Sequence, residues 1–267
     1  MKIGLLAGYG DLPANIARNL KKSGFVIVSI GFSEEVTVDL TPYSDMVYTI
    51  SLGQVGKILN ILKREEVKSV VFAGKVNKTL LYRNMKLDFL AINLLTRMKD
   101  RKDDTIMGQI VSLLEDHGIK VINQTDIIKD NLSQEKVYTI KKPGKNELED
   151  VAFGFSIAKG MGKMDIGQTV VVKGKAVMAV EAIEGTDEAI KRGCNLAGKG
   201  AVIVKVAKPS QDKRFDVPTI GSDTIKHLAD NGGSVLAVEA ESTFIIDLDE
   251  CVRLANKYSI IFIGYKN

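Results

Sequence analysis

The densest group of side chains that could carry out chemistry lies within residues 208–221. This segment is too polar for a core element and longer than most connections between elements. Its charged side chains are Lys208, Asp212, Lys213, Arg214 and Asp216. The basic groups could contact phosphate, and the acidic groups could bind a metal ion or act as a base, so the segment favours metal-assisted phosphoryl chemistry. The alternative is a salt-bridged surface loop.

A second acidic group spans the end of a predicted strand at residues 176–183 and the beginning of a predicted helix at residues 186–196. Its carboxylates are Glu181, Glu184 and Asp187. Because successive side chains of a strand alternate between faces, Glu181 belongs to the strand pattern, whereas Glu184 and Asp187 lie at the turn. Three carboxylates near one strand end could hold Mg²⁺, which prefers oxygen ligands. The alternative is a helix start capped by Thr186 or Glu184.

Glycines follow the first predicted strand, in the segment from Gly8 to Pro13. Glycine lets the backbone turn sharply and approach a ligand, and the following helix start offers unpaired N–H groups to a phosphate. Pro13 replaces the third glycine of the dinucleotide fingerprint, and the second strand lacks the expected ribose-binding acid. The pattern disfavours NAD but favours contact of Gly8, Gly10 and Asp11 with another nucleotide or a phosphate. The alternatives are a tight turn without a ligand and a capping role for Asp11.

Two further loops follow predicted strands of the same sheet, at the edge where open α/β sheets bind ligands. One contains Gly74 and Lys75, whose ammonium group could meet a phosphate. The other contains Thr125, which we expect to contact the same ligand. A lysine in such a loop can also be merely solvated, so this alternative stays open for Lys75.

The elements that must position these groups divide the chain into two parts. In residues 1–128, short apolar runs alternate with amphipathic helices, which predicts a Rossmann-like parallel sheet with helices on both faces. The expected strands there are Lys2–Ala7, Phe25–Ile30, Val47–Ile50, Ser69–Ala73 and Lys120–Ile122. The pattern breaks into polar and turn residues at 129–146, which we take as a linker. Residues 147–267 predict a mixed α/β catalytic domain, with a hairpin around Lys173-Gly174-Lys175.

The composition excludes several other chemistries. The 267 residues include two cysteines and two histidines, too few and too far apart for a zinc site or a disulfide scaffold. Cys194 and Cys251 lie on apolar helical faces, so we expect them to be buried. The net charge of +4 comes without a basic stripe interleaved with aromatics, so no nucleic-acid partner is expected. No apolar run suits a membrane span or a signal peptide, so we expect a cytoplasmic protein.

The motifs taken together resemble those of a known family, the LpxI-type UDP-2,3-diacylglucosamine pyrophosphatases. The resembling segments are Gly8–Pro13, Gly74–Val76, Asp165–Gln168, Ala179–Asp187 and Lys208–Gly221. They follow one another across nearly the whole chain. The resemblance implies a two-domain enzyme of lipid A biosynthesis, which hydrolyses the substrate's pyrophosphate bond to UMP and 2,3-diacylglucosamine 1-phosphate (lipid X) with a divalent cation such as Mg²⁺.

The resemblance also implies roles for the residues. Asp216 matches an essential aspartate of the family and would bind the metal or activate water. Glu181, Glu184 and Asp187 would add metal ligands, Arg214 and Asp212 would belong to the catalytic group, and the substrate-binding residues would be Gly8, Gly10, Asp11, Lys75, Thr125 and Lys208. The partner would be a small-molecule glycolipid nucleotide. Peripheral contact with the inner membrane and assembly into a homo-oligomer are both compatible with such a substrate. The alternatives are a non-catalytic nucleotide- or lipid-binding module and a Rossmann-type NAD(P)-dependent oxidoreductase.

Overall fold

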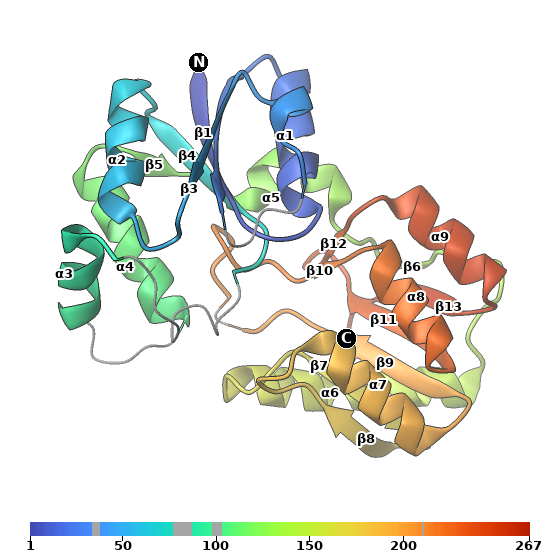
Figure 1. Ribbon diagram of the computed structural model, residues 1–267. Helices are drawn as coiled ribbons and strands as arrows, with labels where there is room; N and C mark the ends of the chain where they lie inside the picture. The colour runs from blue at the N-terminus through green and yellow to red at the C-terminus, as the bar shows by residue number, and fades with distance from the viewer. Residues whose placement is uncertain (34–37, 77–86, 98–102, 210) are drawn as a thin grey trace. The chain divides into compact units, whose positions relative to one another are not determined.

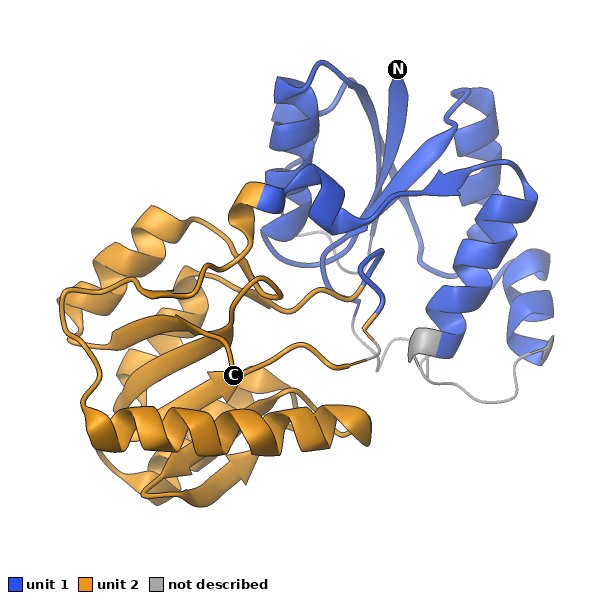
Figure 2. Ribbon diagram, turned by 180° about the vertical axis from the view of Figure 1, so that it is seen from behind, with its two compact units in different colours: residues 1–129, 212–215 blue, residues 130–211, 216–267 orange. Residues whose placement is uncertain are grey.

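The computed structural model describes residues 1–33, 38–76, 87–97, 103–209 and 211–267. The chain forms two compact units (Figure 2). Unit 1 contains residues 1–129 and 212–215, and unit 2 contains residues 130–211 and 216–267. Residues 212–215 are thus part of unit 1, although the chain on both sides of them belongs to unit 2.

Unit 1 is built on a parallel sheet with the strand order β3-β2-β1-β4-β5. Its strands are β1 (Lys2–Ala7), β2 (Val26–Phe32), β3 (Met46–Ile50), β4 (Ser69–Ala73) and β5 (Lys120–Val121). The central strands are apolar runs because both of their faces are covered, and β4 is buried along its whole length. The Rossmann-like parallel sheet predicted from the sequence is therefore confirmed.

Helices cover both faces of this sheet (Figure 1). They are α1 (Leu12–Lys22), α2 (Val55–Arg64), α3 (Phe89–Arg97), α4 (Asp103–Asp116) and α5 (Gln124–Ile127), with the 3₁₀ helices η1 (Thr41–Tyr43) and η3 (Lys129–Asn131). The helix α2 packs Ile58, Leu59 and Leu62 into an apolar cluster with β2, β4 and α4. The helix α1 lies on the opposite face, where α5 contacts it.

Unit 2 is built on a mixed sheet with the strand order β6-β13-β11-β9-β7-β8. Its strands are β6 (Lys136–Val137), β7 (Thr169–Lys173), β8 (Ala176–Val180), β9 (Ala201–Lys205), β11 (Gly233–Glu239) and β13 (Ile261–Tyr265). The strands β9, β11 and β13 are parallel, whereas β6, β7 and β8 pair antiparallel with their neighbours. A short separate pair is formed by β10 (Thr219–Ile220) and β12 (Phe244–Ile245). The mixed α/β class predicted for the second half is confirmed.

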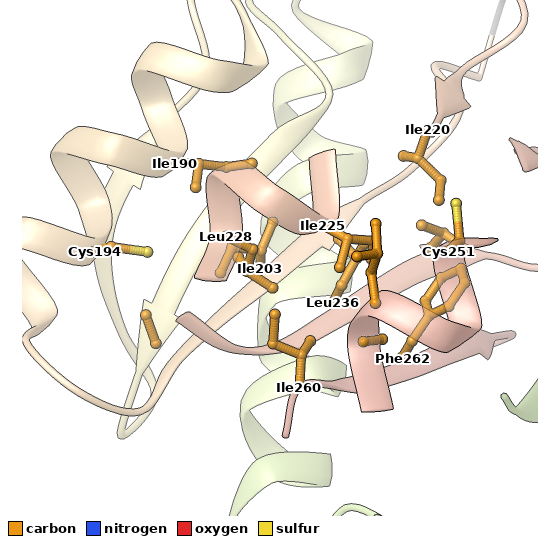
Figure 3. Packing of buried hydrophobic residues seen from close by; sticks show 14 of the residues in the cluster. Ile190, Cys194, Ile203, Ile220, Ile225, Leu228, Leu236, Cys251, Ile260 and Phe262 are labelled. Carbon is orange, nitrogen blue, oxygen red and sulfur yellow. The ribbon is translucent and has the colours of Figure 1, made fainter. Parts of the chain in front are cut away.

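The helices of unit 2 sandwich its sheet. They are α6 (Lys145–Lys163), α7 (Thr186–Ala197), α8 (Ser222–Asp230) and α9 (Leu248–Lys257). Because side chains alternate along a strand, Val202 and Val204 of β9 pack with α6, whereas Ile203 packs with α7, α8 and α9. Figure 3 shows this second cluster, in which Cys194 of α7 and Cys251 of α9 are buried as predicted.

The segment expected as a linker contributes to this sheet. Residues 130–146 belong to unit 2, and β6 within them pairs with β13. The predicted hairpin is formed by β7 and β8, whose turn residues Gly174 and Lys175 both have positive φ. Across the described part of the chain, each helix is too short or too polar to cross a bilayer.

Candidate functional site

Two of the charged residues of the 208–221 loop form a tight ion pair in unit 1. The Arg214 guanidinium donates from Nη2 to Asp212 Oδ2 at 2.7 Å and from Nε to Oδ1 at 3.0 Å. These bonds lower the pKa of Asp212 and raise that of Arg214. Arg214 also lies 3.5 Å from Glu115 of α4. In this state the positive charge of Arg214 is already neutralised, so it can bind an anion only by giving up part of this pairing.

The backbone around this pair is attached to the fold of unit 1. The amide of Gln124 donates to the carbonyl of Lys213 at 3.0 Å, and Phe215 packs against the apolar cluster between the sheet and α2 and α4. These two contacts explain why residues 212–215 belong to unit 1. The sequence predicted the charged groups of this segment but not the apolar anchor beside them.

Asp216 differs from Asp212 in its surroundings. Its side chain is half-buried in unit 2, and within the described ranges its carboxylate has no ion-pair or hydrogen-bond partner. A carboxylate in this condition keeps its lone pairs available for a cation, for water or for a substrate hydroxyl. Of the two acidic residues predicted for this loop, Asp216 is therefore the one whose oxygen atoms are available for chemistry.

Lys208, another predicted phosphate ligand of the loop, is tied to another segment of unit 2. Its Nζ donates to Asp165 Oδ1 at 2.7 Å, and its backbone amide donates to Gln211 Oε1 at 2.9 Å. The ammonium group thus lies at the beginning of the loop, with a carboxylate beside it. Its half-buried position limits the directions from which an anion could approach.

The acidic residues 181–187 are not arranged as a metal site. Glu181 is buried and accepts a hydrogen bond from Thr186 Oγ1 at 3.0 Å, whereas Glu184 is exposed and pairs with Arg192. Asp187 is exposed on the first turn of α7. Within the ranges that the structure describes, no three Asp, Glu, His or Cys side chains are grouped so that they could hold a metal ion. The alternative of a capped helix start is not observed either, since the N-cap is Gly185 without a side-chain cap.

The glycine turn after β1 is held against the loop that follows β4. The amide of Tyr9 donates to the carbonyl of Lys75 at 2.7 Å, and the amide of Lys75 donates back to Tyr9 at 2.9 Å. A Cβ on Gly8 would lie 2.3 Å from the Lys75 oxygen, and one on Gly74 would lie 2.7 Å from the Tyr9 oxygen. Glycine is needed at Gly8 and Gly74 because the two backbones touch, which the sequence did not reveal.

Gly10 is different, because a Cβ there would meet no atom within 4 Å, and its φ of +96° favours glycine. Asp11 is the N-cap of α1, but its side chain makes no cap hydrogen bond. Its exposed carboxylate therefore does not perform the predicted capping role. Gly10 and Asp11 form the open side of the turn.

The predicted ligand groups of unit 1 share one edge of its sheet. Gly8, Gly10 and Asp11 follow β1, Lys75 follows β4, and Thr125 lies on α5 after β5, and these strands are parallel neighbours. Parallel strands end at the same edge, where α/β sheets bind ligands. The exposed Lys75 gives this edge a positive charge.

Sequence reasoning missed several polar residues of unit 2 that the structure brings together. Gln168 and Gln211 are joined by a side-chain hydrogen bond of 3.3 Å, and Lys205 is almost fully buried at the end of β9. A lysine that ends an otherwise apolar strand was a usable signal, because a buried ammonium group needs partners. No sequence pattern near Gln168 or Gln211 indicated that their side chains would form a hydrogen bond.

Both cysteines are buried free thiols with raised pKa values. Burial raises the pKa of Cys194 to about 11 and that of Cys251 to about 12. Both thiols therefore stay protonated at neutral pH.

The fold defines a protein with a Rossmann-type unit followed by a mixed α/β unit. The family description of the LpxI N-terminal domain matches residues 2–131, and that of the LpxI C-terminal domain matches residues 134–263. The chain belongs to the LpxI family.

A named relative supports this membership. The chain is 27% identical over 276 residues to the UDP-2,3-diacylglucosamine pyrophosphatase LpxI of Caulobacter vibrioides, a match that covers 98% of this chain and 97% of the relative.

Solved structures share only weak overall similarity with the chain. A GalE-like L-threonine dehydrogenase from Cupriavidus necator gives a TM-score of 0.36 at 9% identity, covering 100% of this chain and 86% of that one. A biotin carboxylase from Campylobacter jejuni gives a TM-score of 0.29 at 14% identity, covering 73% of this chain and 42% of that one. Similarity at this level carries no functional argument.

Proposed function

We propose that this protein hydrolyses the pyrophosphate bond of UDP-2,3-diacylglucosamine, which releases UMP and 2,3-diacylglucosamine 1-phosphate. Membership of the LpxI family across both units supports this reaction, as does the name of the Caulobacter relative. The observation that carries the proposal is the half-buried carboxylate of Asp216, which has no partner in the described part of the chain. Hydrolysis of a phosphoanhydride needs a group that can orient or deprotonate water, and Asp216 is available for this role.

The charged groups near Asp216 in the sequence have complementary roles in this proposal. Lys208 and Arg214 contact the phosphate groups of the substrate. Each basic side chain must then bind a phosphate oxygen in addition to its present carboxylate partner, which is Asp165 for Lys208 and Asp212 for Arg214. Asp212 holds the Arg214 guanidinium in a fixed orientation, since it accepts from both Nε and Nη2. Preorganised positive groups stabilise the charge that develops as the bond to the leaving phosphate breaks.

A divalent cation fits the donor chemistry of Asp216 but not the larger carboxylate set that the sequence suggested. Mg²⁺ is commonly held by one or two carboxylates together with substrate phosphates, rather than by a complete protein cage. We therefore propose that Asp216 and the substrate's phosphate oxygens hold Mg²⁺, and that Glu181 and Glu184, which have other partners, do not. When bound, the cation would neutralise charge on the phosphate oxygens.

The sheet edge of unit 1 is the proposed contact for the nucleotide portion. Gly10 and Asp11 offer an open turn at the beginning of α1, and Lys75 offers a positive charge at the same edge. Thr125 would add a hydroxyl group. Since the proposed substrate is a glycolipid, we further propose that the protein works in the cytoplasm and meets its substrate at the inner membrane surface. Assembly into a homo-oligomer stays a prediction.

The reaction is tested by incubating purified protein with UDP-2,3-diacylglucosamine and Mg²⁺, with and without EDTA, and following UMP by chromatography. We expect UMP in the presence of the metal and little in EDTA. Asp216→Asn should lower the rate by at least about 100-fold if this carboxylate activates water. Asp223→Asn, at an exposed aspartate of α8, is the matched control and should retain wild-type activity.

The absence of UMP under every divalent-metal condition would overturn the proposed reaction. Tight binding of the glycolipid without turnover would instead identify a binding module. Full activity of Asp216→Asn would remove Asp216 from the mechanism while leaving the reaction itself established.

A further inference from the structure

A row of buried polar side chains crosses three neighbouring strands of unit 2. Thr169 of β7 lies directly opposite Lys205 of β9, and the amide of Glu181, just beyond β8, donates to the Thr169 carbonyl at 2.9 Å. Directly opposed residues of antiparallel strands point to the same face of the sheet. The exposed fractions of Lys205, Thr169 and Glu181 are 4%, 0% and 9%. This polar row therefore lies at the end of a sheet face whose other residues are apolar.

The first residue of α7 connects the two charges of the polar row. Lys205 Nζ donates to Thr186 Oγ1 at 3.1 Å, and Thr186 Oγ1 donates to Glu181 Oε1 at 3.0 Å. The Thr186 hydroxyl has one proton, which it donates to the carboxylate, and its oxygen accepts from the lysine, so the donor and acceptor of both hydrogen bonds are fixed. Charges buried in this way need such partners, so the arrangement holds Glu181 in one orientation.

The second oxygen of Glu181 holds the segment that precedes β7. The amide of Gln168 donates to Glu181 Oε2 at 3.4 Å. The two backbones also touch, because a Cβ on Gly167 would lie only 2.2 Å from the Glu181 carbonyl oxygen. Gln168 is therefore fixed by the polar row through its amide and by the close approach of its glycine neighbour.

Gln168 in turn holds the beginning of the 208–221 loop. Its carbonyl accepts from the amide of Val206 at 2.9 Å, and its Oε1 accepts from Gln211 Nε2 at 3.3 Å. Gln211 Oε1 then accepts from the amide of Lys208 at 2.9 Å. These three hydrogen bonds connect Gln168 to Val206, directly after β9, and through Gln211 to Lys208 at the beginning of the loop.

We propose that Gln168 is a positioning residue for the 208–221 loop, and that Lys205 and Glu181 of the polar row, joined by Thr186, serve to fix Gln168 rather than to bind metal. The inference rests on the proposed function, because it assumes that the loop carries the reacting groups. Gln211 holds the backbone of Lys208, the proposed phosphate ligand at the beginning of the loop, so an error in the position of Gln211 is transmitted to Lys208. Small displacements of a reacting group lower the rate of the chemical step more than they lower substrate affinity.

A double-mutant cycle tests the hydrogen bond between the two glutamines. We expect Gln168→Ala to lower kcat by about fivefold, which is the size expected for one neutral hydrogen bond, with KM changed by less than about twofold. Gln211→Ala should lower kcat at least as much, because it also removes the acceptor of the Lys208 amide. The double variant should be no slower than Gln211→Ala alone, because the bond that Gln168→Ala removes is already absent from Gln211→Ala. Gln168→Glu keeps an acceptor for Gln211 Nε2 and should restore most of the rate. Gln134→Ala, at an exposed glutamine of the same unit, is the matched control.

Losses that multiply to about 25-fold in the double variant, or an unchanged kcat in Gln168→Ala, would overturn the proposal. Circular dichroism spectra of all variants must match the wild type, so that unfolding is excluded as the cause.

Hydrogen exchange separates this proposal from the proposed reaction. In the ligand-free protein, the amide of Lys208 should exchange about fivefold faster in Gln168→Ala than in the wild type, because its acceptor Gln211 loses support. This result needs no substrate, so it stays informative if the wild type fails to release UMP. Exchange at wild-type rates in Gln168→Ala would refute the positioning role, even in an active enzyme.

Discussion

The contact between the turn after β1 and the loop after β4 makes a prediction about two glycines that look equivalent in the sequence. Gly8 and Gly10 were both predicted to contact substrate. In the structure, an added Cβ at Gly8 would lie 2.3 Å from the Lys75 carbonyl oxygen, whereas at Gly10 it would meet no atom within 4 Å. Alanine at the two positions should therefore have different consequences for stability.

The expected costs follow from these distances. The contact at Gly8 is shorter than the 3.0 Å that a real Cβ tolerates, so the two backbones must separate. Separation weakens the paired hydrogen bonds between Tyr9 and Lys75, which measure 2.7 and 2.9 Å. The two weakened hydrogen bonds and the overpacking strain together should lower the free energy of unfolding by about 3 kcal/mol in Gly8→Ala. Gly10→Ala meets only the backbone penalty of a positive φ, about 1–2 kcal/mol.

Native-state hydrogen exchange measures these costs within unit 1, without mixing them with the stability of unit 2. The slowest amides of β1 and β4 report the free energy of unfolding of their sheet. We expect a decrease of about 3 kcal/mol for Gly8→Ala and a clearly smaller decrease for Gly10→Ala. If Gly8→Ala costs no more than Gly10→Ala, the packing explanation for Gly8 is wrong.

Three further predictions concern single side chains. Asp150→Ala should destabilise unit 2 by about 3 kcal/mol in urea unfolding, because the buried carboxylate accepts from two backbone amides of the β7–β8 turn at 2.8 and 2.6 Å. Asp212, whose pKa is lowered by Arg214, contributes stability that is fully present above its unfolded pKa of about 3.9 and is lost as the pH falls through its folded pKa. Asp212→Asn should therefore be less stable than wild type at pH 6, and the difference should shrink as the pH falls below about 3.9. The thiols of Cys194 and Cys251, with pKa values raised to about 11 and about 12, should react with iodoacetamide at pH 8 at least about 100-fold more slowly in the native protein than in urea, and rapid native labelling would contradict their burial.

Much of the fold could be predicted because its strands are buried on both faces. Such strands appear in the sequence as short apolar runs, and the bounds predicted for Lys2–Ala7 and Ser69–Ala73 agree with β1 and β4. The strand expected at residues 176–183 was too long, since β8 ends at Val180 and Ile183 is 87% exposed. The apolar Ile183 lengthened the apparent strand pattern in the sequence, although the fold leaves this side chain exposed.

Glycines were the least predictable residues, because their reasons lie elsewhere in the chain. Glycine often ends a helix, but α6 runs through Gly160 and Gly162 to Lys163. A Cβ on Gly162 would lie 3.3 Å from the Cα of Lys208, so this glycine allows the helix to pass close to the loop. Glycine as a helix terminator and glycine as a packing contact look identical in a sequence.

The candidate site shows the same limit for acidic residues. The sequence placed Glu181, Glu184 and Asp187 in one metal-binding set, because the three carboxylates lie near one predicted strand end. Strand alternation turns Glu181 inward to Thr186 and Gln168, whereas Glu184 stays outside with Arg192. The inward partners come from distant segments, so no local pattern could have revealed them.

The same reasoning separates the two aspartates of the 208–221 loop. Their charges and positions suggested one shared catalytic role for Asp212 and Asp216. A carboxylate that accepts three hydrogen bonds from one guanidinium has a lowered pKa and is a weak base, so Asp212 is suited to orienting Arg214. Asp216 has no such partner among the described residues, so its oxygens are available to a cation or to water. The proposal of a chemical role for Asp216 rather than Asp212 therefore rests on the partners of the two carboxylates, which the sequence does not show.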